Sequence, residues 1–380
     1  MAYTKRELMN IYTENIQKIK ADVLRWRRFI SRREILLAIF VTVVVIIVGV
    51  GLGWENNKVV PVNADPAARY TQEIHNHLSF MANWDGPDYI NLAQHGYTQV
   101  VQTSFFPVYP LAIRLVNQVV SSPLVSSLIV SWLCLVGAIY YYLKIIKKLY
   151  GVRDNLEALR GALFFILFPT GVFLIATYTE SLFAFLALAS IYYALRKRYL
   201  MAAPFLLLAT ATRVNGLFVL ALVVLLLWEQ KEKLRNILAT LVIGSMGMLS
   251  YMVYLANRFH NPIAFVTAQK DHGWLKYGYA DFATELVSIN GLFLLAIAVS
   301  VLYWWPRRKS FAIYSLLYVA IALLGGLGGF GRYALMAFPL QFMLYELQRP
   351  KRLGYPLVIA LFGIGWVFFM LRYAGGYSGG

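Results

Sequence analysis

The chain has 380 residues, of which 59% are hydrophobic and only 14% are charged, and its mean hydropathy is +0.60. Such a composition cannot cover a surface with polar groups in water, which excludes a soluble globular protein and predicts an integral membrane protein. The formal net charge of +17 is also typical of nucleic-acid-binding proteins. The distribution of the basic residues along the chain distinguishes binding to nucleic acid from contact with anionic lipids.

About thirty polar and basic residues come first, which favours a cytoplasmic segment over 1–34 rather than a cleaved signal peptide, and a retained signal-anchor helix over 35–54. Ten further apolar runs bring the expected total to about eleven transmembrane helices in an all-α polytopic membrane protein. These runs are 123–143, 161–177, 181–195, 200–212, 215–228, 237–257, 286–305, 311–324, 333–345 and 355–371. Several are shorter than the roughly 20 residues that cross a bilayer, which predicts helices extended by flanking turns or broken helices that line a cavity. We expect one transmembrane domain over 35–372 and a short flexible tail over 373–380.

The single cysteine, Cys134, lies within an apolar run and is expected to be a buried, inert thiol. Basic clusters occupy every second loop, so that about 26 of the 35 lysines and arginines would face the cytoplasm and about nine the opposite side, as the positive-inside rule requires. Anionic membrane lipids then account for the charge, and we expect no nucleic-acid partner.

This orientation depends on the segment FFPVYPLAIRLVNQVV (105–120), which must not cross the membrane. Pro107 and Pro110 break its helix near the start, and Arg114 at the bilayer centre would cost roughly 2.5–3.5 kcal/mol. We therefore predict that it lies along the interface as part of a first extracytoplasmic loop over 55–122.

The face opposite the basic clusters carries the short polar motifs of the chain. They are NWDGPDY (83–89), TYTES (177–181), TATRVNG (210–216), FVTAQKDHGW (265–274) and GGFGRY (328–333). A polar face above a bundle of short helices is a place where a reaction on a membrane-bound substrate can occur.

The first motif has the signature of a helix N-terminus, with Asp85 as N-cap, Pro87 in the first turn, Asp88 in the capping-box position and Gly96 closing the helix. On one interpretation Asp85 only caps this helix, a contribution of about 1 kcal/mol. On the other it is a general base, and Trp84 beside it is an aromatic wall for a sugar or lipid group. Both hold if Asp88 supports the turn while Asp85 projects into a cavity.

The stretch WDGPDYINLAQHGYTQVVQTSFFPVYPLAIRL resembles the W-D…Y…A…G-Y…F-F-P-x-Y-P pattern of the PIG-V-like family. These membrane glycosyltransferases include the GPI mannosyltransferase that adds the second mannose, together with prokaryotic relatives. ATYTESLFAFLAL, TATRVNG, AFVTAQKDHGW and GRYALMAFPL are similar to later motifs of the family and follow in the same order, up to about residue 340. The compact loops favour a prokaryotic member.

The resemblance implies a GT-C fold, whose first extracytoplasmic loop carries the catalytic acid, and a polyprenyl-phosphate sugar as donor, with mannose as the expected sugar. Asp85 matches the catalytic aspartate of the motif. The expected partners are this donor, a lipid, glycan or protein acceptor, and membrane lipids. No metal or other cofactor is expected, because the chain has no glycine loop for a nucleotide and DGPD has the wrong spacing for a D-x-D metal pair.

The expected mechanism is direct displacement with inversion, in which Asp85 takes the proton of the acceptor hydroxyl and the lipid phosphate leaves from the opposite face. Arg213 and Arg332 are the candidate cations for this phosphate, although each could instead be an arginine that snorkels to the headgroups. The full set of candidate substrate-binding residues is Trp84, Asp88, Tyr89, Glu180, Arg213, Asn215, Gln269, His272, Trp274, Arg332 and Tyr333.

Three of these candidates have open alternatives. Glu180 either orients its turn or forms an ion pair with Arg213, or else acts as a second acid, and we favour the structural or substrate-orienting role. Trp274 either stacks on a sugar or belongs to the aromatic belt, and His272, with Lys270, either adds to the phosphate site or is solvated. The alternative function is a lipid or lipid-linked sugar transporter or flippase, against which the chain shows no pair of interrupted segments in two halves.

Overall fold

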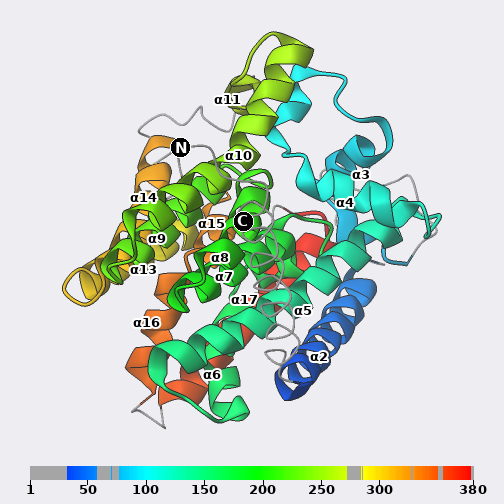
Figure 1. The fold of residues 1–380 in the computed structure, drawn as a ribbon. Coiled ribbons are helices and arrows are strands. Elements are labelled where there is room, and N and C mark those ends of the chain that lie inside the picture. Colours follow the sequence, from blue (N-terminus) through cyan, green and yellow to red (C-terminus); the bar gives the residue numbers. More distant parts are fainter. Residues whose placement is uncertain are drawn as a thin grey trace, which may run out of the picture.

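The computed structural model describes residues 32–57, 70, 77–271, 284, 286–325, 327, 329–349 and 354–377. Every regular element in these ranges is a helix, which confirms the prediction of an all-α polytopic membrane protein (Figure 1). Most of the predicted cytoplasmic segment 1–34 lies outside the described residues. Four helices are long and apolar enough to cross a membrane: α2 (Arg32–Asn57), α5 (Pro123–Tyr150), α10 (Leu234–Phe259) and α17 (Gly354–Ala374).

Shorter helices occupy the other predicted runs. They are α6 (Asn155–Ile166), α7 (Glu180–Leu195), α8 (Tyr199–Thr210), α9 (Gly216–Glu229), α13 (Ile289–Trp304), α14 (Lys309–Gly325) and α16 (Phe338–Gln348). Each has fewer than the roughly 20 residues that span a bilayer as a straight helix, in agreement with the expectation of short or broken helices.

Two predicted runs are wrong as continuous helices. The run 161–177 ends as α6 at Ile166, and the chain continues past Pro169 into a 3-10 helix, η4 (Gly171–Leu174). The run 333–345 is divided between α15 (Phe330–Leu335) and α16, which has Pro339 in its first turn. Proline lacks the backbone N–H of a helical hydrogen bond and disfavours helical geometry in the residue before it, so it often ends a helix, and hydropathy does not register this effect.

The first loop folds into η2 (Ser79–Ala82), α3 (Gly86–His95), η3 (Val100–Ser104) and α4 (Val108–Asn117), with α3 and α4 packed together beside the bundle (Figure 1). The ten residues of α4 span only about 15 Å, less than a straight helix needs to cross a bilayer, which agrees with the expectation that this segment does not cross the membrane. Its Tyr109 and Ile113 are buried, whereas Leu111 and Leu115 are exposed on the outer side, an arrangement that suits a helix resting on a membrane. Arg114 donates through Nε to the Ala93 carbonyl (2.6 Å) and so closes the end of α3.

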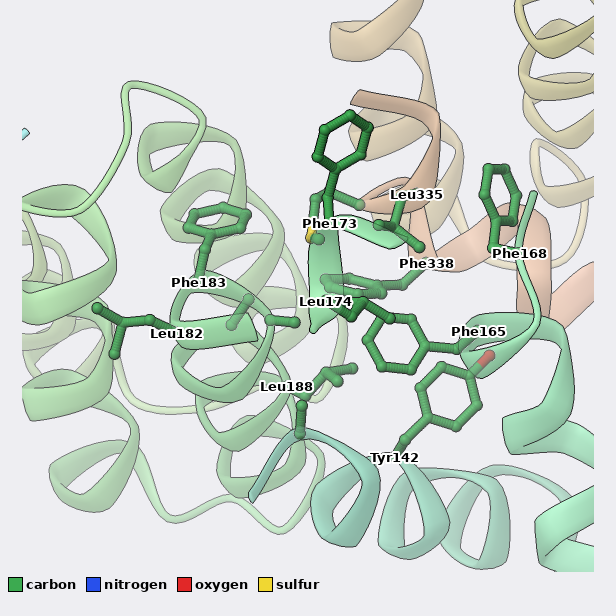
Figure 2. Packing of buried hydrophobic residues seen from close by; sticks show 14 of the residues in the cluster. Tyr142, Phe165, Phe168, Phe173, Leu174, Leu182, Phe183, Leu188, Leu335 and Phe338 are labelled. Carbon is green, nitrogen blue, oxygen red and sulfur yellow. The ribbon is translucent and has the colours of Figure 1, made fainter. Parts of the chain in front are cut away.

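The centre of the bundle is α7, in which every residue except Phe185 is buried. Figure 2 shows an aromatic layer beside it, to which α5, α6, η4 and α16 each contribute. Tyr142 and Phe165 stack with ring centroids 5.4 Å apart and an interplanar angle of 14°. This layer supports η4 and thereby fixes the turn at 175–179 that leads into α7.

The last helix, α17, runs two residues beyond the predicted limit of the transmembrane domain, and its final residues Tyr373 and Ala374 are buried. The structure describes the predicted tail, residues 373–380, as far as Tyr377.

Candidate active site

Four charged side chains from distant segments meet at one end of the bundle. Asp85 precedes α3, Glu180 begins α7, Arg213 lies between α8 and α9, and Arg332 is in α15. Arg332 binds Asp85 through Nη1 and Oδ2 (2.7 Å) and Glu180 through Nε and Oε1 (2.9 Å). Arg213 Nη1 binds the same Glu180 oxygen at 2.6 Å. We call these four residues the charge cluster; each was a candidate from a different sequence motif.

Glu180 is the centre of the charge cluster and its side chain is completely buried. A buried carboxylate is costly unless it is paired and hydrogen-bonded, and here both guanidinium groups donate to it. Arg213 Nη1 also donates to Thr179 Oγ1 at 2.9 Å, which ties the arginine to the turn before α7. The ion pair between Glu180 and Arg213 is therefore present, together with a second one to Arg332 that the sequence did not suggest.

Both arginines also make cation–π contacts with aromatic rings. The Arg332 guanidinium lies over Tyr178 (4.6 Å to the ring centroid) and Phe173 (5.1 Å), and that of Arg213 lies 5.9 Å from the ring centroid of Tyr333. The exposed fractions of the side chains are only 13% for Arg213 and 20% for Arg332. Both groups thus point inward to Glu180 instead of extending toward headgroups.

Asp85 occupies the N-cap position of α3, as predicted, but its side chain makes no capping hydrogen bond. The capping interpretation of this carboxylate is therefore wrong, since Oδ2 binds Arg332. The side chain is 20% exposed, and among the described residues no hydrogen bond involves Oδ1. Gly96 ends α3, as predicted, and has a positive φ of 75° that glycine adopts without a steric cost.

Two further candidates, Tyr89 and Asn215, lie near the charge cluster. Tyr89 is buried and packs edge-on against Phe105 and Tyr109, with both ring centroids 5.1 Å away. Burial and the nearby Asp85 carboxylate raise the pKa of Tyr89, so its hydroxyl keeps its proton. Asn215 precedes α9 and is 1% exposed, and in the described part of the chain its side-chain nitrogen and oxygen have no hydrogen-bond partner.

The remaining candidates lie at the start of α3, on a separate helix or outside the described residues. Asp88 is in the first turn of α3, and the half-buried Trp84 donates its indole N–H to the Tyr377 carbonyl at 3.1 Å. Gln269 is on α11 (Ala264–Asp271), which packs against η3. It makes no hydrogen bond or ion pair with the charge cluster within the described structure. His272 and Trp274 lie outside the described residues.

Sequence reasoning missed several residues that shape the site. Tyr178 and Thr179 stand inside the TYTES motif, so the motif itself offered a signal for them. Phe173 offered none, because an apolar residue in an apolar run has no distinguishing pattern.

Comparison with known proteins assigns the chain to a family. The family described as Mannosyltransferase (PIG-V) matches residues 59–253, just over half of the chain, a range that contains Asp85, Glu180 and Arg213 but ends before Arg332. The chain is 29% identical to mouse GPI alpha-1,6-mannosyltransferase 2 over 167 residues, which cover 41% of this chain and 34% of the mouse protein. It is 30% identical to the human protein of that name over 166 residues, with the same shares of 41% and 34%. It is 28% identical to GPI mannosyltransferase 2 of Drosophila pseudoobscura pseudoobscura over 116 residues, which cover 28% of this chain and 26% of the relative. The aligned part thus spans about a third or less of the length of these relatives. The family match, which covers more than half of the chain, shows that the chain belongs to the mannosyltransferase (PIG-V) family.

Proposed function

We propose that this chain transfers a mannosyl group from a polyprenyl-phosphate donor to an acceptor hydroxyl at the extracytoplasmic face of the cell membrane, as an inverting enzyme of the GT-C type. The observation that carries the proposal is the charge cluster, in which a carboxylate lies next to two inward-pointing guanidinium groups and has one oxygen to which no described residue donates a hydrogen bond. Membership of a mannosyltransferase family supports mannose as the transferred sugar. The relatives are named for GPI, and for this chain a lipid-linked acceptor is part of the proposal.

Asp85 is the proposed general base. Its Oδ1 takes the proton of the acceptor hydroxyl as that oxygen forms a bond to the anomeric carbon. The bond between the anomeric carbon and the phosphate oxygen breaks on the opposite face, so the configuration is inverted and polyprenyl phosphate leaves with the bonding electrons. The ion pair with Arg332 fixes the carboxylate through Oδ2, while Oδ1, which accepts no hydrogen bond within the described part of the chain, is the proposed proton acceptor.

Arg213 and Arg332 are the proposed phosphate-binding residues. Within the described residues, Arg213 uses only Nη1 for hydrogen bonds, and Arg332 uses only Nη1 and Nε. The remaining N–H groups are available to the phosphate, and guanidinium groups bind such oxygens with strong charge-assisted hydrogen bonds. Because Glu180 already holds both arginines in place, little reorganisation is needed as negative charge develops on the leaving group. Asn215 and Tyr333, beside Arg213, are proposed to complete this side of the site.

The geometry of α5 supports the proposed orientation. At its start, Ser127 and Ser131 hydrogen-bond to Thr177 (2.8 Å) and Tyr178 (3.4 Å), next to the charge cluster. Its last turns carry the basic cluster, in which Lys147 is 2.6 Å from Glu34 at the start of α2. The 28 residues of α5 are about 42 Å long, so the charge cluster and the basic cluster lie at opposite ends of a membrane-spanning helix.

Labelling of single cysteines tests this orientation. In a Cys134→Ser background, we expect Gln94→Cys, at the exposed end of α3, to react with an impermeant maleimide on intact cells. Lys231→Cys, in a basic loop, is the matched control and should react only after the cells are permeabilised. The opposite pattern of reactivity would place the site in the cytoplasm and refute the proposal.

A transfer assay tests the reaction itself. The purified protein is reconstituted in vesicles with radiolabelled polyprenyl-phosphate mannose or polyprenyl-phosphate glucose and a panel of lipid, glycan and peptide acceptors. We expect mannosyl transfer, and we expect Arg213→Ala to raise the KM for the donor roughly 10- to 100-fold, the loss of one or two charged hydrogen bonds. Arg258→Ala, an exposed arginine near the end of α10, is the control and should leave this KM unchanged. Movement of the labelled lipid across the bilayer without any transfer would instead support the transporter interpretation.

A further inference from the structure

The end of α17 is hydrogen-bonded to the loop that carries Asp85. Asn83 Nδ2 donates to the Tyr373 carbonyl (3.1 Å), and the carbonyls of Met81 (3.0 Å) and Asn83 (3.1 Å) share the single proton of the Tyr373 hydroxyl. Four residues further on, the Tyr377 carbonyl accepts the indole N–H of Trp84 at 3.1 Å. These bonds join segments about 290 residues apart, and Asn83 and Tyr373 are both buried.

The backbone of Trp84 explains why such support is needed. Its φ is 63°, in the left-handed region that residues with large side chains rarely adopt. A conformation of this kind is energetically unfavourable and persists only where the surrounding structure imposes it. Trp84 directly precedes Asp85, so its φ determines the direction in which the Asp85 carboxylate leaves the chain.

The end of α17 is shaped to reach this loop. Gly376 has a φ of 81°, its N–H donates to the Tyr373 carbonyl (3.0 Å), and the Tyr377 N–H donates to the Arg372 carbonyl (3.0 Å). These are the two hydrogen bonds of a Schellman motif, in which glycine supplies the left-handed residue after the helix. The motif reverses the chain so that the Tyr377 carbonyl faces Trp84.

We propose that Trp84, Tyr373 and the Tyr377 carbonyl form a C-terminal clamp that holds Trp84 in its left-handed conformation and thereby aims Asp85 at the reacting hydroxyl. The clamp residues are positioning residues, since they act through Asp85, and the proposal rests on the function proposed above. Tyr178 assists from the other side, because its hydroxyl oxygen accepts the Asp85 backbone N–H at 3.2 Å. Loss of the clamp lets Trp84 relax toward negative φ and turns the carboxylate away from Arg332.

The clamp predicts a change in kcat more than in KM. The proposed phosphate contacts belong to Arg213 and Arg332, which Glu180 holds independently of the clamp. A displacement of about 1 Å at a reacting group can lower a rate about 100-fold. We therefore expect clamp variants to lower kcat by about 10- to 100-fold, with little change in the KM for the donor.

A double-mutant cycle tests this inference. Trp84→Phe removes the indole N–H and keeps an aromatic ring, and a stop codon after Gly376 removes the acceptor carbonyl. If the two changes break the same contact, the double variant should be no slower than the slower of the two single variants. Trp228→Phe, an exposed tryptophan on α9, is the matched control and should keep the kcat of the wild type. Unchanged kcat in both single variants, or losses that multiply in the double variant, would overturn the clamp.

Hydrogen exchange of the peptide 78–92, followed by mass spectrometry, separates the clamp from the proposed reaction. We expect faster exchange at 81–86 in both single variants and wild-type exchange in Trp228→Phe. If the two variants exchange faster but the wild-type protein transfers no mannose, the clamp is supported and the proposed function is refuted. Unchanged exchange in both variants would refute the clamp, whatever the transfer assay shows.

Discussion

Replacement of Asp85 by asparagine is expected to lower kcat for mannosyl transfer by about 10²- to 10⁴-fold, the usual contribution of a well-placed general base. Asparagine has nearly the same shape and can still accept the Arg332 hydrogen bond that Oδ2 now receives at 2.7 Å. It cannot accept the proton of the acceptor hydroxyl. The substitution therefore removes the proposed chemistry with little change in the arrangement of the site, and the KM for the donor should stay within a few-fold of that of the wild type.

The measurement is single-turnover transfer from polyprenyl-phosphate mannose in reconstituted vesicles. Asp154→Asn is the matched control, because Asp154 also precedes a helix but uses its carboxylate to accept the Glu157 N–H at 2.9 Å. Transfer by Asp85→Asn at the wild-type rate would remove Asp85 from the role of base.

Glu180→Ala is expected to destabilise the fold by about 3–5 kcal/mol, the cost of breaking a buried ion pair by removing one partner. Glu180 is completely buried and is the carboxylate that both Arg213 and Arg332 share. Without it, two guanidinium groups remain close together in a poorly solvated site, with Asp85 as the one remaining carboxylate of the charge cluster.

Thermal unfolding in detergent, with the midpoint compared between variants, measures this loss. Glu232→Ala is the control: this glutamate, near the surface, accepts hydrogen bonds from the Lys233 N–H (3.1 Å) and Asn236 Nδ2 (2.8 Å). Its removal should cost no more than about 1 kcal/mol, as for other exposed capping groups. An equally small loss for both variants would mean that Glu180 does not hold the arginines together.

The charge cluster also clarifies how the proposed base and the proposed phosphate site are related. Arg332 contacts both carboxylates, through Nη1 to Asp85 and through Nε to Glu180. A shift of α15 would therefore alter the base and the cation together. Arg332 lies outside the matched family range, so this part of the site was recognised from a sequence motif and from geometry alone.

The local features of this protein could be predicted from its sequence. Composition determined the membrane class and the all-α fold, since an apolar chain in lipid must satisfy its backbone hydrogen bonds within helices. The helix that begins after Asp85 and ends at Gly96 was predictable, because a proline in the first turn and a glycine with positive φ after the last turn act within a few residues. The errors at 161–177 and 333–345 arose where apolar runs continue through a proline break that hydropathy does not register.

The sequence also identified the motifs that carry Asp85, Glu180, Arg213 and Arg332, but only the tertiary structure decided how they pair. Asp85 and its partner Arg332 are 247 residues apart, and Trp84 and the Tyr377 carbonyl are 293 residues apart. No periodicity or turn pattern extends over such distances, because local patterns reflect interactions between near neighbours along the chain. Which carboxylate receives which guanidinium, and which distant segment holds a strained tryptophan, depends on how the helices pack against one another.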